Sequence, residues 1–166
     1  VSHVNNGERT GAGSAYWVDN TAGVFPDFVQ VVFNGTQTID RVVVYALQDA
    51  YWSPVEPTDA TTFSIYGPTA FTVEGWNGAA WVNLATVTGN NLLTRTVTFA
   101  AFTADRIRVN ITKALASYSR ITETEAWSSN VGPGLAPGIP GVLEKVITDP
   151  VKLPRIDGLA FDQYGN

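Results

Sequence analysis

The strongest alternation of apolar and polar positions lies in residues 26–45, PDFVQVVFNGTQTIDRVVVY. In its first half, apolar side chains recur at every second position, as on the buried face of a β-strand: Val29, Val31 and Phe33. Asn34-Gly35 then predicts a turn, because glycine accepts the positive φ that other residues resist. Residues 39–46 are rich in β-branched side chains, as in a strand buried on both faces. We therefore predict two strands joined by a short turn and covered by a second sheet.

Similar short patterns recur as far as residue 127 and predict further strands: 63–66, 70–76, 81–87, 93–101, 106–111 and 121–127. Asn77-Gly78 lies between the second and third of these and predicts a hairpin. The cleanest alternation is in residues 106–111, where every second residue is expected to face inward: Ile107, Val109 and Ile111. About eight short strands without an amphipathic helix indicate an all-β antiparallel sandwich or barrel over residues 1–128.

The composition changes after this region. Residues 129–141 include NVGPGLAPGIPG and form a Pro/Gly linker, semi-extended rather than packed. Residues 142–166 resume a β-like pattern, and we interpret them as an extended tail that starts a further β domain or packs on a neighbour. An isolated pair of strands is marginally stable in water, so we predict that this tail contacts another chain or domain more than it contacts its own sandwich.

The chain of 166 residues is long enough for one domain with a substantial core. The net charge of −5 and the lack of a basic stripe argue against nucleic acid as a partner. There is no apolar run of membrane-spanning length, and cysteine is absent. Methionine is absent even at position 1, which indicates a processed or excerpted piece. Abundant threonine, valine and aromatic residues with little lysine favour an extracellular or surface-exposed protein (secreted, cell-surface or virion).

Six segments of the chain form a recognisable series: VNNGERTG (4–11), YWVD (16–19), residues 26–45, FTVEGWNGAAWVNLATVTGN (71–90), TRTVTFAAFTADRIRVNITKA (94–114) and SYSRITETEAW (117–127). Together they resemble the discoidin, or coagulation-factor type C, superfamily, whose fold is the galactose-binding-like jelly roll. They lie in the order that the family has, and the family includes many bacterial carbohydrate-binding modules. Such domains begin with a strand before the NNG turn, whereas three residues precede it here, so we expect that strand to be cut away or supplied by another segment or chain.

The tail has a second resemblance. LPRIDGLAFDQYGN at 153–166 is similar to the opening strand of an NHL-type β-propeller repeat, over half a hairpin.

The resemblance implies a structural calcium site where the turn after the first strand meets the last strand. The implied ligands are Asn6, Glu8, Thr10, Glu123 and Glu125. Calcium binds six to eight hard oxygens, which turn carbonyls and carboxylates supply. Asn6 stands where an Asp is common in the family, and Glu8 stands where a shorter Asp or Asn is common. The alternative is that Glu123 and Glu125 form a solvated strand face that pairs with Arg9.

Aromatic residues in the predicted loops form a candidate sugar site, because aromatic faces contact the C–H side of sugar rings and polar groups bind the hydroxyls. The candidate ligand-binding residues are Trp17, Asp19, Tyr51, Trp52, Tyr118 and Arg120, with Tyr16, Gln48 and Asp49 nearby. The alternative for Trp17 and Tyr118 is that they close the end of the core. The adjacent pair Tyr51-Trp52 is harder to explain by packing alone.

Catalysis has little support, because His3 is the one histidine and no two carboxylates are placed convincingly for glycoside hydrolysis. We therefore predict a non-catalytic, carbohydrate-binding adhesion module of a larger secreted or surface protein, of bacterial or phage origin. The alternative is an assembly module of an extracellular or phage particle, completed by strand exchange with a neighbouring subunit. A third interpretation is an appendage of a propeller enzyme.

Overall fold

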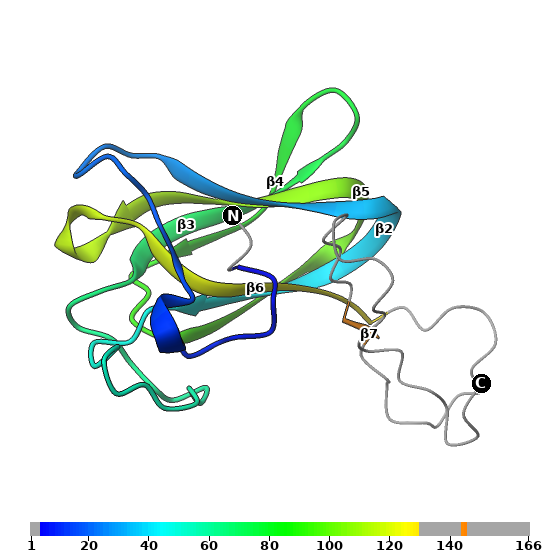
Figure 1. Ribbon diagram of the computed structural model, residues 1–166. Helices are drawn as coiled ribbons and strands as arrows, with labels where there is room; N and C mark the ends of the chain where they lie inside the picture. Colours follow the sequence, from blue (N-terminus) through cyan, green and yellow to red (C-terminus); the bar gives the residue numbers. More distant parts are fainter. Residues whose placement is uncertain (1–3, 130–143, 146–166) are drawn as a thin grey trace, which may run out of the picture.

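The computed structural model describes residues 4–129 and 144–145. Within them, all strands pair antiparallel in the order β1-β6-β2-β5-β3-β4, with β7 on β6 (Figure 1). The strands are β1 (Trp17–Val18), β2 (Asp27–Ala46), β3 (Pro68–Trp76), β4 (Trp81–Thr88), β5 (Thr94–Ala114), β6 (Arg120–Ser128) and β7 (Glu144–Lys145). Two short 3₁₀ turns are η1 (Ala12–Ser14) and η2 (Leu115–Ser117). The prediction of an all-β antiparallel fold is confirmed.

The two longest strands, β2 and β5, form a bent ribbon that belongs to both layers of the sandwich. Their register runs from Asp27 opposite Ile111 to Tyr45 opposite Thr94, with shifts after Val32 and after Ile39. On one side of the bend, β3 pairs with the C-terminal part of β5, and β4 pairs with β3. On the other side, β6 pairs with the C-terminal part of β2. Figure 1 shows the ribbon running through the bend between the layers.

The predicted turn at Asn34-Gly35 is a bulge inside β2, not a reversal of the chain. Residues 33–36 lie opposite Asp105 alone in the pairing with β5, and Gly35 has a φ of 82°. A bulge of this kind bends a strand and increases its twist. The predicted strands on either side therefore continue as β2, and residues 93–101 and 106–111 likewise merge into β5 because β5 follows β2 through the bend.

The core lies between the two layers and confirms the alternation read from the sequence. One layer contributes residues from the N-terminal part of β2 and the C-terminal part of β5, with β3 and β4: Val29, Val31, Phe71, Val73, Val87, Ile107, Val109 and Ile111. The other contributes Ile39, Val42, Val44, Val97, Ile121 and Ala126. Burial of each such side chain stabilises the fold by roughly 1.5–3 kcal/mol.

Two local predictions have different outcomes. The hairpin around Asn77-Gly78 is confirmed, with Trp76 opposite Trp81. The predicted strand at 63–66 is wrong, because the backbone there is irregular apart from an isolated bridge between Thr62 and Leu92. Phe63 is nevertheless buried, against a small cluster that includes Ala46 and Leu93. Phe63 is apolar because it packs into this small cluster beneath the loop, and not because it belongs to a strand.

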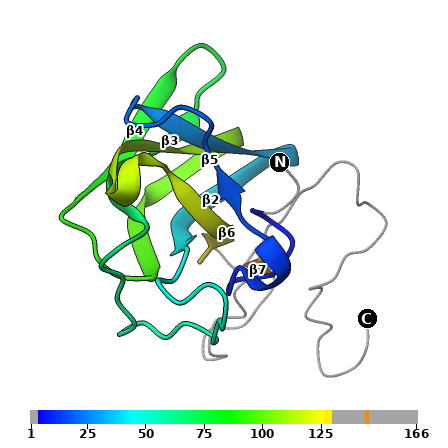
Figure 2. The same cartoon turned by 60° about the vertical axis from the view of Figure 1, so that its left-hand side comes forward.

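The loops that follow β1, β2 and η2 gather at one end of the sandwich, on the left of Figure 1 and brought forward in Figure 2. At the start of the described chain, the buried residue Val4 accepts a hydrogen bond from the Thr124 N–H at 2.7 Å, so it extends the sheet along β6. β7 pairs with Trp127 and Ser128. The predictions for the linker and for the rest of the tail lie outside the described residues. In the described part, no helix is long and apolar enough to cross a membrane.

Candidate ligand-binding site at the loop end of the sandwich

An aromatic cluster lies at the loop end and includes the predicted pair Tyr51 and Trp52. Trp52 is 73% exposed and Tyr51 is 40% exposed. The Tyr51 ring is the centre of the cluster, with ring centroids 5.4 Å from Trp52, 5.8 Å from Tyr66 and 6.5 Å from Tyr16. All three contacts are edge-to-face, a preferred geometry for aromatic pairs. Tyr51 is therefore held by its neighbours, and Trp52 projects from the cluster into solvent.

Arg120 extends the cluster toward η2. Its guanidinium carbon lies 4.9 Å from the Tyr66 ring centroid and 5.2 Å from that of Tyr118. Its Nη1 donates a hydrogen bond to the Tyr118 carbonyl at 3.2 Å. The structure thus brings together four of the six predicted ligand-binding residues, Tyr51, Trp52, Tyr118 and Arg120, through Tyr66, which the sequence analysis did not single out.

Gln48, two residues after the end of β2, fixes the segment that carries Tyr51 and Trp52. Its amide oxygen accepts from the Val55 N–H at 3.1 Å, and its Nε2 donates to the Val55 carbonyl at 2.7 Å. The same Nε2 donates to the Thr10 carbonyl at 3.2 Å. Gln48 is buried, so these bonds close the loop 48–55 and tie it to the N-terminal segment. Its role is to position the loop.

Asp49 performs the same task for the segment that carries Tyr66. Its Oδ2 accepts from the Ser64 N–H at 2.8 Å and from the Ser64 hydroxyl at 2.9 Å. Its Oδ1 accepts from the N–H groups of Ile65 and Tyr66 at 2.9 and 3.2 Å. Burial alone would raise the pKa of Asp49, but these hydrogen bonds outweigh it and hold the pKa below its usual value.

The remaining two predicted residues lie deeper. Asp19 is buried, and its carboxylate accepts from the Ser119 N–H at 2.6 Å and the Thr21 N–H at 2.8 Å. These bonds join the loop after β1 to the start of β6. Trp17 is half-buried and packs against the core cluster, as the alternative interpretation of this residue had it.

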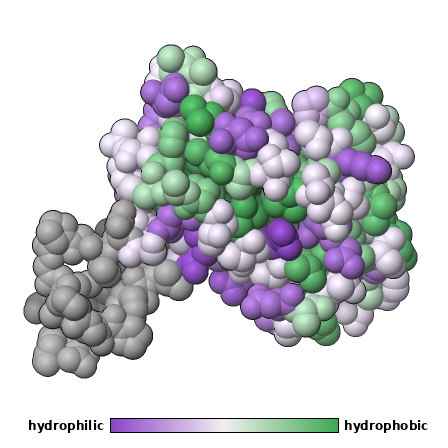
Figure 3. Space-filling view, turned by 180° about the vertical axis from the view of Figure 1, so that it is seen from behind, coloured by the Kyte–Doolittle hydropathy of each residue, from purple (hydrophilic) through white to green (hydrophobic). Residues whose placement is uncertain are grey.

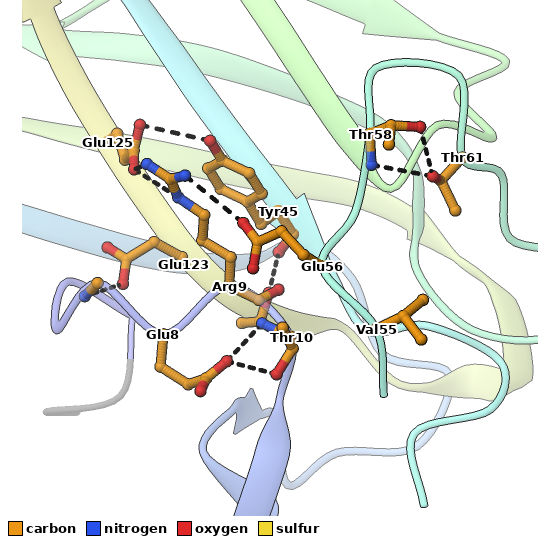
Figure 4. A network of polar contacts seen from close by, with 12 residues as sticks. Glu8, Arg9, Thr10, Tyr45, Val55, Glu56, Thr58, Thr61, Glu123 and Glu125 are labelled. Atoms are coloured by element: carbon orange, nitrogen blue, oxygen red, sulfur yellow. Dashed lines mark hydrogen bonds and ion pairs between the residues drawn. The ribbon is translucent and has the colours of Figure 1, made fainter. Parts of the chain in front are cut away.

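Behind the cluster, Arg9 joins the last strand to the aromatic loop (Figure 4). Its Nη2 and Nε donate to Glu125 Oε1 at 2.6 and 3.0 Å, and its Nη1 lies 3.6 Å from Glu56. Burial alone would lower the pKa of Arg9, but the hydrogen bond and charge of Glu125 raise it. Burial and the charge of Glu125 raise the pKa of Tyr45 to about 12.

The interpretation of Glu123 and Glu125 as a solvated strand face is wrong, because both are buried. The suggested pairing with Arg9 is correct for Glu125, whose carboxylate also accepts from Trp127 Nε1 at 3.1 Å. Glu123 Oε2 accepts from the Gly7 N–H at 2.7 Å and so lies against the predicted calcium turn. The N-terminal segment lies over this face of β6 and contacts both carboxylates, which explains why they are out of water.

Within the turn, side chains are bonded to the backbone and to one another. Asn6 Oδ1 accepts from the Glu8 N–H at 2.9 Å, and Glu8 Oε1 accepts from the N–H and hydroxyl of Thr10 at 2.6 and 2.5 Å. The hydroxyl bond from Thr10 is the largest cause of the lowered pKa of Glu8. In the described part of the chain, no group of three or more acidic, histidine or cysteine side chains is placed to hold a metal.

A second aromatic group lies on the outer strand face of β3, β4 and β5. Trp76 and Trp81 form an edge-to-face pair at 5.5 Å, and the Arg108 guanidinium lies 4.4 Å from the Trp81 ring. Arg108 Nε donates to Glu74 at 2.6 Å, so this group is satisfied by its own cross-strand contacts. Seen from behind, hydrophobic residues also gather below the projecting β3–β4 hairpin (Figure 3).

Comparison with solved structures finds sugar-binding modules with the same fold. A CBM32 module, CpGH89CBM32-5 from Clostridium perfringens in complex with GalNAc-β-1,3-galactose, has a TM-score of 0.56 and 9% identity over 75% of this chain and 80% of its own. The family 32 CBM of C. perfringens NanJ, in complex with galactose, has a TM-score of 0.54 and 17% identity over 75% and 82%.

Chitosan-binding module 2 of a chitosanase/glucanase from Paenibacillus sp. IK-5, in complex with chitotriose, has a TM-score of 0.51 and 20% identity over 75% and 91%. No family model matches the chain, and a comparison with curated proteins also found no match. At these identities the comparisons establish the fold alone: the chain has the galactose-binding-like β-sandwich fold that the sequence analysis predicted.

Proposed function

We propose that this chain is a non-catalytic carbohydrate-binding module whose ligand binds to the aromatic loop cluster. The observation that carries the proposal is Trp52, a large aromatic side chain that is 73% exposed at the end of a cluster otherwise packed together. A ring held in this way offers a flat apolar face to the C–H side of a pyranose. Arg120 and the tyrosine hydroxyls supply polar groups in the same cluster.

The positioning of the loops supports the same function. Gln48 and Asp49 are adjacent, and they fix the two segments that carry Tyr51 and Tyr66. A binding surface formed before the ligand arrives avoids the cost of ordering loops on binding. The structural neighbours that bind galactose, GalNAc-β-1,3-galactose and chitotriose make sugars the leading ligand class.

The proposal is tested by glycan-array binding and by affinity retention on the glycans that the array identifies. We expect Trp52→Ala to reduce retention at least about fivefold, because the stacking of a flat ring on one aromatic side chain, as measured for nucleic-acid bases, contributes on the order of 1–3 kcal/mol. Its melting temperature should stay within a few degrees of the parent value, since the side chain is mostly in water.

Phe28→Ala is the matched control, because Phe28 is also an exposed aromatic residue, at 53%, but lies on the strand face of β2. Retention should be unchanged in this variant. Full retention by the double variant Trp52→Ala, Tyr51→Ala would exclude the loop cluster as the site, and a complete absence of glycan binding by the parent protein would exclude the function.

The proposed setting is a secreted or surface-exposed multidomain protein, in which the module attaches another domain to glycans. The strand-exchange assembly module is less favoured, because Val4 already lies buried along β6 and the structural neighbours bind sugars. Size measurement in solution separates the two: the carbohydrate-binding interpretation requires no partner subunit.

The calcium site also stays a proposal, and the contacts of the predicted ligands reduce the set of residues that could hold the ion. Glu125 does not fit as a calcium ligand, because its carboxylate already forms an ion pair with the Arg9 guanidinium. Glu123 fits better, since its buried carboxylate faces the turn at Gly7. The ion would be held by Glu123 together with oxygens of the turn at residues 6–10, and its role would be to fasten the N-terminal segment to β6.

A further inference from the structure

We propose that the N-terminal segment, residues 4–11, positions the aromatic loop cluster, so that release of this segment from β6 abolishes glycan binding. The inference rests on the proposed function and concerns the regulation of the same site. The segment is bound to β6 on one side and to the loop 48–56 on the other (Figure 4). Docking of the segment and binding of the glycan are therefore coupled, and each stabilises the other.

Four consecutive residues of β6 hold the segment through hydrogen bonds: Thr122, Glu123, Thr124 and Glu125. Their partners are the carbonyl of Val4, the N–H of Gly7, and both the carbonyl and the guanidinium of Arg9. The bonds of Val4 and Gly7 are each 2.7 Å long. Val4 also belongs to the buried core cluster. The segment is thus docked along β6 over its whole length.

Two contacts join the same segment to the loop 48–56, which carries the exposed aromatic pair. The Thr10 carbonyl accepts a hydrogen bond from Gln48 Nε2 at 3.2 Å, at the start of the loop. The Arg9 Nη1 lies 3.6 Å from a carboxylate oxygen of Glu56, at the end of the loop. The segment therefore supports the loop at both of its ends.

Gly11 shows how closely the segment fits against the base of this loop. Its φ is 81°, and a Cβ atom at this position would lie 2.9 Å from Leu47 Cδ1 and 3.1 Å from Thr122 Cγ2. The first of these distances is shorter than real Cβ contacts. The backbone of the segment is thus in direct contact both with β6 and with the residue that precedes Gln48.

The segment is also a part of the domain that can open by itself. Residues 4–11 form no helix or strand, and separate hydrogen bonds and one buried ion pair hold them in place of a continuous strand ladder. Local opening of such a segment costs less free energy than global unfolding. Opening removes both supports of the loop 48–56 while the strands stay paired. The released state is therefore a folded domain without a formed site.

The experiment is amide hydrogen exchange of the ¹⁵N-labelled full chain, measured by NMR with and without glycan. The probe is the tightest binder among galactose, GalNAc-β-1,3-galactose, chitotriose and the glycans of the array. The amides of Gly7 and Thr124 report release of the segment, because both donate hydrogen bonds across its contact with β6. With the glycan at about ten times its dissociation constant, we expect exchange at both amides to slow about elevenfold, because only the docked state binds.

Two other amides serve as internal references. The Val109 amide lies in the buried part of β5 and reports global unfolding, so its exchange in the free protein should be slower than that of Gly7. The Ala80 amide donates to Asn77 Oδ1 at 2.9 Å in the β3–β4 hairpin, which projects away from the loop end (Figure 1). Local opening of the hairpin leaves the site intact, so the glycan should not change exchange at Ala80.

Thr122→Val and Thr124→Val are a matched pair of variants, because both residues are buried in β6. The Thr122 hydroxyl donates to the Arg9 carbonyl at 2.8 Å and lies 3.2 Å from the Tyr45 carbonyl. Among the described residues, the Thr124 hydroxyl has no hydrogen-bond partner. We expect Thr122→Val to speed exchange at Gly7 severalfold in the free protein, since it removes one bond that holds the segment. Thr124→Val should leave this exchange unchanged.

Exchange at Gly7 that the glycan does not slow would overturn this inference and leave the carbohydrate-binding function standing. Exchange at Gly7 as slow as at Val109 in the free protein would also overturn it, because the segment would then not open by itself. Equal slowing at Ala80, or an equal effect of the two variants on Gly7, would overturn it as well. Binding of no glycan at all would overturn both proposals.

Discussion

Asp49→Asn is the substitution that tests how the aromatic cluster is held in place. The new side chain has almost the same shape, but it keeps one acceptor oxygen and places an amide NH₂ where Oδ2 now accepts from the Ser64 N–H and hydroxyl. Two hydrogen bonds are lost, each with a net contribution of roughly 0.5–1.5 kcal/mol. Because solvent reaches this loop, each bond should contribute near the lower end of its range. We therefore expect the free energy of unfolding to fall by about 1–2 kcal/mol in total.

For a domain of this size, such a loss lowers the melting temperature by roughly 4–8 °C. Glycan retention should fall as well, because the segment with Tyr66 is no longer fixed beside Tyr51 and Arg120. The assay is a pair of thermal melts at pH 7 with retention measured in parallel. Asp105→Asn is the control: its carboxylate forms an exposed ion pair with Arg106, and its removal should not change the melting temperature measurably.

The pH dependence provides a second readout for the same residue. The pKa of Asp49 is lower in the folded protein than its usual value of 3.8, so its carboxylate stabilises the fold above about pH 4. This stabilisation is lost as the pH falls through the folded-state pKa. The difference between the parent and Asp49→Asn should therefore be present at pH 7 and shrink below pH 4. Equal melting at pH 7, or a difference that is the same at pH 2.5, would refute the role given to Asp49.

Three further predictions concern the rest of the domain. Val109→Asp should unfold it, because Val109 is fully buried in the C-terminal half of β5; an unchanged cooperative melt would contradict the core assignment. The Tyr45 hydroxyl, with its pKa raised to about 12, should titrate near pH 12 in an ultraviolet scan. The stability that its raised pKa contributes should be lost as the pH rises from about 10 through 12. Titration of Tyr45 at pH 10 would disprove its burial beside Glu125. Excess chelator should lower the melting temperature if calcium fastens Glu123 to the turn, with calcium restoring it; an unchanged melt with no metal by elemental analysis would remove the ion.

Alternation in the sequence was sufficient to predict the inward faces of the strands. Every second residue of 106–111 is buried as expected, and the β3–β4 hairpin forms at Asn77-Gly78. Alternation did not reveal that β2 and β5 continue through the bend. A glycine with positive φ serves both a turn and a bulge, and the choice between them depends on the partner strand, which single-sequence patterns do not contain.

Only part of the candidate site was predicted, because long-range contacts that a single sequence does not contain position the rest. Tyr51 and Trp52 stand out because two adjacent large aromatic residues lie in a polar loop. Tyr66 has no such signal, and its position in the cluster depends on the hydrogen bonds that Asp49 makes 15 or more residues along the chain. Similarly, the burial of Glu123 and Glu125 comes from the N-terminal segment that covers β6, and strand periodicity alone does not distinguish a covered face from a solvated one.

The central claim is that a glycan binds at the loop end through Trp52. The most direct measurement is a ¹H–¹⁵N NMR titration of the labelled protein with the strongest glycan from the array, following the tryptophan indole signals. The account predicts that the Trp52 indole and the backbone amides of residues 49–52 and 64–66 shift together with one dissociation constant, while the Trp76 and Trp81 indoles on the strand face do not move. Shifts confined to Trp76 and Trp81, with Trp52 unchanged, would contradict it.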